Sequence, residues 1–197
     1  MSTRCSFFVT LLIVIFACGV AGGQNQTPAT PMVEFNIAGV GKIQVPDLEV
    51  RDQEGRKVHF YSDLIKEKVV VLSFFYTSCN YSCTMQGKTF SRLQSLLGDR
   101  LGKSVFLISV SIDPANDSPS VLKAWGKRYD VESGWTLVTG NPAEMNNLLL
   151  PFTGGPAGSE MHLPSTFIGN DRTGLWTSAA GVFEAKELLH AVEFVTR

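Results

Sequence analysis

The sequence is poor in the residues that form metal and redox sites. It contains four cysteines and three histidines in 197 residues. Two of the cysteines, Cys5 and Cys18, lie in an apolar N-terminal segment, which leaves Cys79 and Cys83 as the thiols of the folded part. Because this pair has no second pair to join, a closed four-cysteine zinc site is excluded. Any sulfur chemistry of the domain therefore depends on Cys79 and Cys83.

The chain also lacks a strong charge of either sign. Its 17 lysines and arginines nearly balance its 18 aspartates and glutamates, and the formal net charge is -1. Proteins that bind nucleic acid carry a basic surface, so we expect no nucleic-acid partner. The length fits one domain with a short extra segment, and such a domain can bury a sizeable core.

Residues 1–26 resemble an export signal, with a basic residue, an apolar core over 7–17 and small residues after it. The apolar run is short for a spanning helix, which needs about 20 residues. Two routes of processing are open. Cleavage after Ala21 would release the protein, whereas Ile15-Phe16-Ala17-Cys18 resembles a lipoprotein box in which Cys18 is lipidated. Both routes predict an exported protein of the periplasm or cell envelope, and membrane attachment would use the leader or Cys18.

A polar segment with two prolines, residues 27–33, is typical of a flexible tether, and one domain over residues 34–197 follows it. Within the domain, alternating and apolar runs predict strands, and apolar residues at helical spacing predict helices. We expect hairpins or strand pairs over 34–45, 48–60 and 166–179, single strands near 69–75, 105–111 and 135–138, and helices that follow Cys83, Ser118, Asn141 and Glu184.

Residues 69–83 form the stretch around which the other elements are organised. The stretch begins with a run of β-branched and aromatic residues, typical of a strand buried on both faces of a parallel sheet. Small polar residues and the two cysteines follow, and then Phe90, Leu93 and Leu97 recur at helical spacing. The cysteines are therefore expected between the carboxyl end of a strand and the first turn of a helix, where open α/β sheets build their sites.

Cys79 and Cys83 are four residues apart, so on a helix they share one face. A helix N-terminus stabilises a thiolate and lowers its pKa. Two such thiolates suit Cu(I), and with an added imidazole they suit Cu(II). The pair could also close a disulfide, although three residues separate the cysteines, whereas the usual oxidoreductase motif has two. The simpler alternative is a structural disulfide or two inert buried thiols.

The order of elements predicts an α/β fold with a mixed central sheet, helices on both faces and an N-terminal β-hairpin extension. A strand, a turn, two cysteines and a helix in that setting make the thioredoxin arrangement. We therefore expect a thioredoxin-like domain.

Four groups of residues form recognisable motifs: Phe-Tyr-Thr-Ser-Cys at 75–79 with Cys83, Ser-Val-Ser-Ile-Asp-Pro at 109–114 with Asp-Ser-Pro at 117–119, Leu-Val-Thr-Gly at 137–140, and His162. Together they resemble the SCO/SenC family of copper-binding assembly proteins, from about Pro46 to the C-terminus. The resemblance implies that one copper ion is bound by Cys79, Cys83 and His162. It also implies that the protein delivers copper, or reduces thiols, for the binuclear copper centre of cytochrome c oxidase. Asn80, Tyr81 and Thr84 stand where the family usually has Pro, Asp and Pro.

Two functions follow from this interpretation. The first is a copper metallochaperone whose partner is the copper subunit of cytochrome c oxidase or another copper oxidase. The alternative is a thiol–disulfide oxidoreductase that keeps a partner's copper-site cysteines reduced. Cys79 would be the attacking thiolate and Cys83 the resolving one, and a thioredoxin-like protein would reduce the resulting disulfide. A peroxiredoxin-type peroxidase ranks last because the nearest following arginine, Arg92, lies well down the helix.

The remaining polar residues receive simpler interpretations. His59 and His190 are expected to be surface or packing residues, because nothing polar converges on them in the sequence. Asp113 either supports the metal site or caps the loop before Pro114. Glu160 is a candidate partner for the second nitrogen of His162. Pro164 is where a thioredoxin fold often has a cis-proline, and we predict a cis peptide there.

Overall fold

The computed structural model describes residues 30–153 and 165–197. The helices are α1 (Ser82–Leu97), α2 (Pro119–Lys127), α3 (Pro142–Thr153) and α4 (Ala185–Val195), with a short 3-10 helix η1 (Gly98–Arg100). The strands are β1 (Met32–Ala38), β2 (Gly41–Pro46), β3 (Glu49–Asp52), β4 (Lys57–His59), β5 (Val69–Phe75), β6 (Val105–Ser111), β7 (Trp135–Thr139), β8 (Ser165–Asn170) and β9 (Leu175–Ala180). In this part of the chain they form one nine-stranded sheet in the order β2-β1-β9-β8-β5-β6-β7-β3-β4.

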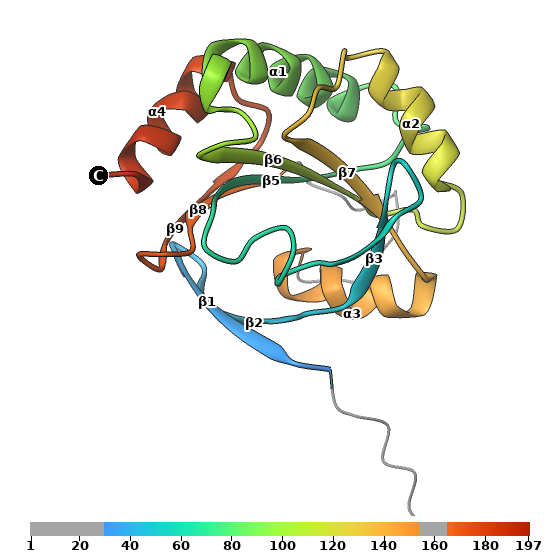
Figure 1. Cartoon of the computed structure of the whole chain (residues 1–197), viewed down its shortest axis with the longest axis horizontal. Helices are drawn as coiled ribbons and strands as arrows, with labels where there is room; N and C mark the ends of the chain where they lie inside the picture. Colours follow the sequence, from blue (N-terminus) through green and yellow to red (C-terminus); the bar gives the residue numbers. More distant parts are fainter. Residues whose placement is uncertain (1–29, 154–164) are drawn as a thin grey trace, which may run out of the picture.

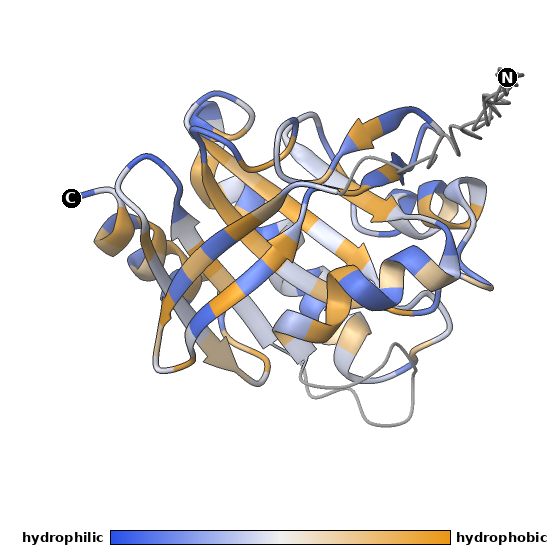
Figure 2. Ribbon diagram, turned by 90° about the horizontal axis from the view of Figure 1, so that it is seen from below, coloured by the Kyte–Doolittle hydropathy of each residue, from blue (hydrophilic) through white to orange (hydrophobic). Residues whose placement is uncertain are grey.

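The centre of the sheet is β5, and all seven of its residues are buried. It pairs in parallel with β6 on one side and antiparallel with β8 on the other. Its β-branched and aromatic side chains suit a strand covered on both faces. Hydrophobic residues are concentrated in the central strands, whereas the connecting turns are more hydrophilic (Figure 2). The predicted buried strands over 69–75 and 105–111 are therefore confirmed.

The helices lie on both faces of this mixed sheet, as the sequence predicts (Figure 1). Helices α1, α2 and α4 cover one face, and their buried side chains join those of the central strands in one core. Helix α3 lies on the other face, where the sheet curls so that residues of β1 and β2 share a second core with α3. The fold is thioredoxin-like, with the cysteine segment leading into α1 at the carboxyl end of β5.

The predicted N-terminal hairpin is present, because β1 and β2 pair antiparallel through a turn at Gly39 with φ +81°. Strand β1 includes Met32 and Val33, the last two residues of the predicted tether. It also pairs in parallel with β9, and the Phe35 ring stacks on the Trp176 ring with centroids 4.4 Å apart. The hairpin thus extends the sheet and contributes to its second core.

Helix α2 begins at Pro119, directly after Ser118, as expected. The Ser118 hydroxyl makes a 3.0 Å hydrogen bond with the Ser120 hydroxyl and caps no backbone N–H. Helix α3 runs to Thr153 and includes Pro151. Within the described ranges, no helix is both long and apolar enough to traverse a bilayer.

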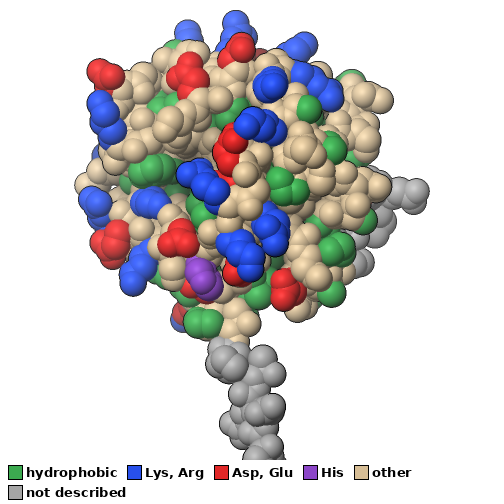
Figure 3. All heavy atoms as spheres, turned by 45° about the vertical axis from the view of Figure 1, so that its right-hand side comes forward, with side chains coloured by type: hydrophobic (Ala, Val, Ile, Leu, Met, Phe, Trp, Pro, Cys, Tyr) green, Lys and Arg blue, Asp and Glu red, His purple; other side chains and the backbone are tan. Residues whose placement is uncertain are grey.

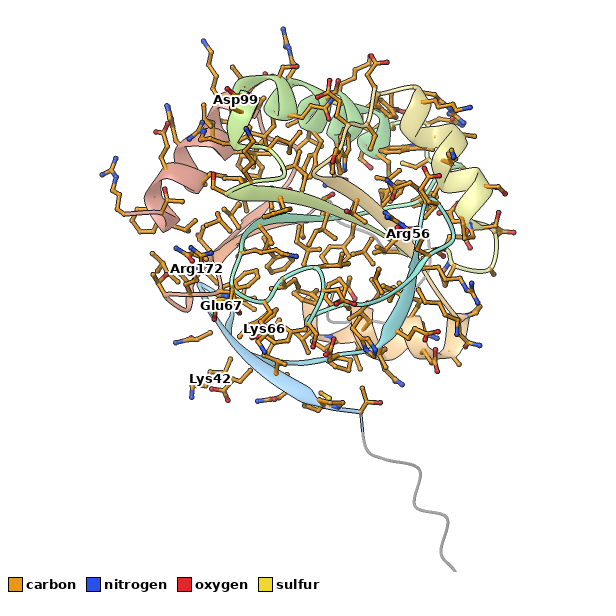
Figure 4. All side chains as sticks on the ribbon, in the orientation of Figure 1. Lys42, Arg56, Lys66, Glu67, Asp99 and Arg172 are labelled. Atoms are coloured by element: carbon orange, nitrogen blue, oxygen red, sulfur yellow. The ribbon has the colours of Figure 1, made fainter. Side chains whose placement is uncertain are left out.

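At the end of the sheet away from the cysteines, the β8–β9 turn is fastened to the segment before β5. The Asp171 carboxylate accepts a 2.8 Å hydrogen bond from the Glu67 N–H, and Arg172 Nε donates to the Glu67 carbonyl at 2.8 Å. Glu67 and Arg172 lie close together in Figure 4. These bonds fix the pairing of β8 with β5, and therefore fix where β8 begins at the opposite, cysteine-bearing end.

The surface carries charges of both signs. Basic and acidic side chains are interspersed on the face shown in Figure 3. Several are paired, including Lys57 with Glu49 at 2.8 Å and Lys123 with Glu54 at 2.5 Å. This distribution agrees with the formal net charge of -1.

Candidate metal centre

The two cysteines lie where the sequence predicts, between the carboxyl end of β5 and the first turn of α1. The Cys79 N–H donates to the Tyr76 carbonyl at 3.2 Å, which turns the chain sharply after the strand. Cys83 is the second residue of α1. Both side chains are buried, with 8% of Cys79 and 1% of Cys83 exposed, and both are free thiols.

The sulfur atom of Cys79 is surrounded by hydrogen-bond donors from the first turn of α1. Cys79 Sγ accepts a hydrogen bond from the Cys83 N–H at 3.3 Å and lies 3.6 Å from the Ser82 hydroxyl. This geometry turns the unpaired N–H groups at the start of α1 toward Cys79.

These contacts separate the pKa values of the two thiols. Burial opposes ionisation of Cys79, but the hydrogen bonds from Cys83, Ser82 and the Tyr81 N–H outweigh it and lower the Cys79 pKa to about 7. Burial first, and then the interaction with the Cys79 sulfur, raise the Cys83 pKa to about 12. Near neutral pH, Cys79 is therefore partly a thiolate, whereas Cys83 keeps its proton.

The pKa difference predicts a pH profile of thiol reactivity. In the reduced protein, iodoacetamide should modify Cys79 much faster than Cys83, because only the thiolate reacts and Cys83 is buried. The rate at Cys79 should rise with pH, reach half its maximum near pH 7, the pKa of Cys79, and then level off. Mass spectrometry of peptides after timed alkylation measures both rates. A half-maximum near pH 9, or faster modification of Cys83, would contradict the described hydrogen bonding.

Tyr76 lies against the same sulfur. The interaction of its hydroxyl with the Cys79 sulfur raises the pKa of the Tyr76 phenol, and burial and the negative charge of the Cys79 thiolate also raise it. The hydroxyl therefore stays protonated and remains able to donate to the Cys79 thiolate.

A buried carboxylate, Asp117, holds the cysteine segment in place. Asp117 is 1% exposed and accepts hydrogen bonds from the Thr77 N–H at 3.2 Å, the Thr77 hydroxyl at 2.5 Å and the Ser111 hydroxyl at 2.6 Å. These bonds join the segment after β5 to the end of β6. Sequence reasoning placed Asp117 only within a family motif and assigned it no role. An acidic residue two positions before the first-turn proline of α2 was the available signal.

Replacing Asp117 with asparagine should destabilise this junction. Asparagine keeps the shape but loses the charge, and hydrogen bonds to a charged acceptor contribute about 1.5–3 kcal/mol. We expect the free energy of unfolding in urea to fall by about 2 kcal/mol. The control is Asp113→Asn, because Asp113 accepts its side-chain hydrogen bonds from the exposed Asn116 amide. Equal losses in the two variants would contradict an anchoring role for Asp117.

The donor set fits a soft cation. Cys79 lies three residues before α1 and Cys83 is its second residue, so the two cysteines do not share one helix face as the spacing suggested. When deprotonated, two cysteine sulfurs placed in this way suit Cu(I). In the part of the chain that the structure describes, no group of three His, Cys, Asp or Glu side chains converges as a metal site. Within residues 30–153 and 165–197, Cys79 and Cys83 are therefore not joined by a third His, Cys, Asp or Glu ligand.

The sequence between residues 42 and 154 matches the family model described as SCO1/SenC. This match covers more than half of the 197-residue chain and includes both cysteines and Asp117. The chain belongs to the SCO1/SenC family.

Known proteins agree with this assignment. The SCO1/SenC chain is 28% identical to a SCO1 protein homolog of Bacillus subtilis over 130 residues, which are 66% of the chain but only 60% of that relative. Its structure is similar to BsSco, a member of the Sco family of cytochrome c oxidase assembly proteins, with a TM-score of 0.62, 22% identity and coverage of 82% and 94% of the two chains. Copper-bound yeast Sco1 gives a TM-score of 0.60 with 18% identity and coverage of 77% and 94%. At these identities the structural likeness shows the shared fold.

The other residues singled out from the sequence divide into two groups. His59 on β4 and His190 on α4 are exposed, which confirms their interpretation as surface residues of this SCO1/SenC domain. The Asp113 carboxylate accepts two hydrogen bonds from the Asn116 amide, so it closes the loop before α2. His162, Glu160 and the predicted cis peptide at Pro164 lie outside the described residues, as does the predicted leader.

Proposed function

We propose that this SCO1/SenC protein is a copper metallochaperone. It binds one copper ion through Cys79, Cys83 and His162 and assists assembly of the copper centre of cytochrome c oxidase or another copper oxidase. The observation that carries this proposal is the pair of buried, adjacent sulfurs at the start of α1. The copper bound to yeast Sco1 and the role of the Sco family in oxidase assembly support it.

The course of β8 supports His162 as the third ligand. Strand β8 runs antiparallel to β5 and pairs Thr166 with Ser73, so Ser165 stands near the carboxyl end of β5. An extended chain spans at most about 3.6 Å per residue, so the Cα atom of His162 is within about 11 Å of that of Ser165. An imidazole entering at this end would complete a trigonal set of two sulfurs and one nitrogen.

The reduced protein should take up one equivalent of Cu(I) in competition with bicinchoninate. Loaded with Cu(II), the wild type should show sulfur-to-copper charge-transfer absorption and a spin-resonance spectrum with nitrogen coupling. His162→Ala should lose the nitrogen coupling and bind Cu(II) at least about tenfold more weakly, a loss of about 1.4 kcal/mol. His190→Ala, an exposed histidine on α4, is the matched control and should behave as the wild type. Unchanged Cu(II) spectra in His162→Ala would refute the ligand assignment.

The different pKa values of Cys79 and Cys83 bear on how the reduced protein takes up copper. Cys79 ionises at about 7 and presents a thiolate at neutral pH, whereas Cys83, with a pKa of about 12, must lose its proton when it becomes a ligand. Uptake of Cu(I) at pH 7 should therefore release between one and two protons. A disulfide between the cysteines would remove both ligands, so the thiol state controls binding.

The same pKa separation favours a second candidate function, a thiol–disulfide oxidoreductase. The Cys79 thiolate would attack a partner's disulfide and release one partner thiolate. Cys83 would then lose its proton and attack Cys79 Sγ, which frees the partner as a dithiol and leaves a Cys79–Cys83 disulfide. A thioredoxin-like protein would supply the two electrons that restore the dithiol. Trapping of a mixed disulfide by Cys83→Ser, and not by Cys79→Ser, is the test of this route.

We also propose that the protein is exported and works in the periplasm or cell envelope, because residues 1–26 have the pattern of an export signal. Mass spectrometry of the mature N-terminus distinguishes cleavage after Ala21 from lipidation of Cys18. An intact Met1 on the mature protein would contradict export by either route.

A further inference from the structure

Gln86 presents a buried donor without an acceptor. Gln86 is 6% exposed, and glutamine is rarely buried so completely. In the described part of the chain, two buried side-chain polar atoms make no hydrogen bond, Gln86 Nε2 and Thr139 Oγ1. A buried amide N–H without an acceptor costs free energy, so an acceptor gained in another state of the site would be favourable.

The position of Gln86 relates this donor to the cysteines. Gln86 lies three residues after Cys83 on α1, and Cys83, Gln86 and Phe90 are all buried by the same side of the helix. Residues three apart on a helix are neighbours. Long helical side chains lean toward the N-terminus, over the preceding turn. A carboxamide at position 86 can therefore turn toward the side chain of Cys83.

The sulfur of Cys83 becomes a stronger hydrogen-bond acceptor when it binds copper. A thiol is a weak acceptor, whereas a thiolate that binds a metal carries charge and accepts a strong hydrogen bond. Cys83 is 1% exposed, so water has little access to solvate that charge. A protein donor must supply the solvation, and ligand atoms in metal sites generally receive such hydrogen bonds.

We propose that Gln86 Nε2 donates a hydrogen bond to Cys83 Sγ when this sulfur binds Cu(I), which makes Gln86 a positioning residue for the loaded state. The inference rests on the proposed copper binding. It explains why a glutamine is buried with a free donor in the unloaded fold.

The chain contains a matched control. Gln94 lies on the same helix, two turns beyond Gln86, and is 4% exposed. Its Nε2 donates to the Asp130 carbonyl at 2.6 Å, and its Oε1 accepts from the Glu132 N–H at 3.3 Å. Gln94→Leu therefore removes hydrogen bonds that exist in the unloaded protein and that lie far from the sulfurs, whereas Gln86→Leu removes an unpaired donor.

The experiment compares both variants with the wild type in Cu(I) affinity, by competition with bicinchoninate, and in urea unfolding without metal. Gln86→Leu should bind Cu(I) about tenfold more weakly, or about 1.4 kcal/mol, with no lower unfolding midpoint. Gln94→Leu should lower the midpoint and leave Cu(I) affinity unchanged. In ¹⁵N-labelled wild type, the side-chain amide signal absent from Gln86→Leu should shift on addition of one equivalent of Cu(I).

Each other result has a defined meaning. Wild-type affinity in Gln86→Leu, or an amide signal that Cu(I) leaves unmoved, would overturn the role of Gln86 while the proposed function stands. A lower unfolding midpoint with unchanged affinity would give Gln86 a structural role and would also overturn the inference. A wild-type protein that binds no Cu(I) would refute the proposed function and this inference together.

Discussion

Cys83→Ser is expected to lower the Cu(I) affinity of the reduced protein by at least about a hundredfold. Structural zinc sites with four ligands are worth about 10–16 kcal/mol, so one thiolate ligand contributes roughly 3 kcal/mol. Cys83 is 1% exposed, and a serine hydroxyl in its place is a poor ligand for a soft cation. Competition with bicinchoninate measures the affinity.

The control for this variant is Ser95→Ala, which changes an exposed residue of the same helix whose hydroxyl donates to the Ser91 carbonyl at 3.1 Å. Its copper affinity should equal that of the wild type. Near-ultraviolet circular dichroism should show that Cys83→Ser remains folded. If folded Cys83→Ser held Cu(I) as tightly as the wild type, the paired-sulfur site would be excluded.

Gly169→Val is expected to have the largest effect on folding. Gly169 on β8 pairs directly with Trp176 on β9, and a Cβ atom at Gly169 would overlap the Trp176 indole ring. The ring cannot move aside easily, because Phe35 stacks on it at 4.4 Å and Trp176 is 2% exposed. Overpacking a close-packed core costs about 1–3 kcal/mol and sometimes more, so we expect a loss of about 3 kcal/mol in unfolding free energy.

Urea unfolding followed by tryptophan fluorescence measures the loss in Gly169→Val. Gly174→Asn is the matched control in the same hairpin. Gly174 has φ +68°, which asparagine tolerates, and a Cβ there would meet no atom within 4 Å. This control should change the unfolding free energy by less than about 0.5 kcal/mol. A similarly small change in Gly169→Val would contradict the described packing of β8 against Trp176.

The sequence was sufficient to predict the parts of the fold that depend on local pattern. The buried runs at β5 and β6 lie where the apolar residues predict them, because a strand covered on both faces needs such a run. The placement of Cys79 just before α1 and of Cys83 in its first turn follows from the change to helical spacing after Cys83. The cysteine pair was therefore recognisable before any coordinates.

Features that depend on tertiary contacts could not be predicted in this way. The hydrogen bond between Thr77 and Asp117 joins residues 40 positions apart, and no local sequence pattern predicts that pairing. The missing acceptor of Gln86 is a property of the packed helix. The difference between the two thiol pKa values likewise arises from unequal burial and from hydrogen bonds that form only when α1 is in place.

The order of strands in the sheet shows which strands are neighbours, and the order of elements along the sequence does not. Sequence patterns predicted a late hairpin but not its neighbours, whereas the structure inserts β8 between β9 and β5. This arrangement brings the start of β8 to the cysteine end of the sheet, which is the physical basis for proposing His162 as a ligand. The proposal that His162 is a ligand thus rests on the sequence resemblance and on the position of β8 beside β5.

X-ray absorption spectroscopy of the protein loaded with one equivalent of Cu(I) is the most direct test of the proposed centre. The proposal predicts a first shell of two sulfur atoms and one nitrogen, with the outer-shell scattering of a single imidazole that disappears in His162→Ala. A shell that contains no sulfur, or a spectrum without imidazole scattering in the wild type, would contradict it.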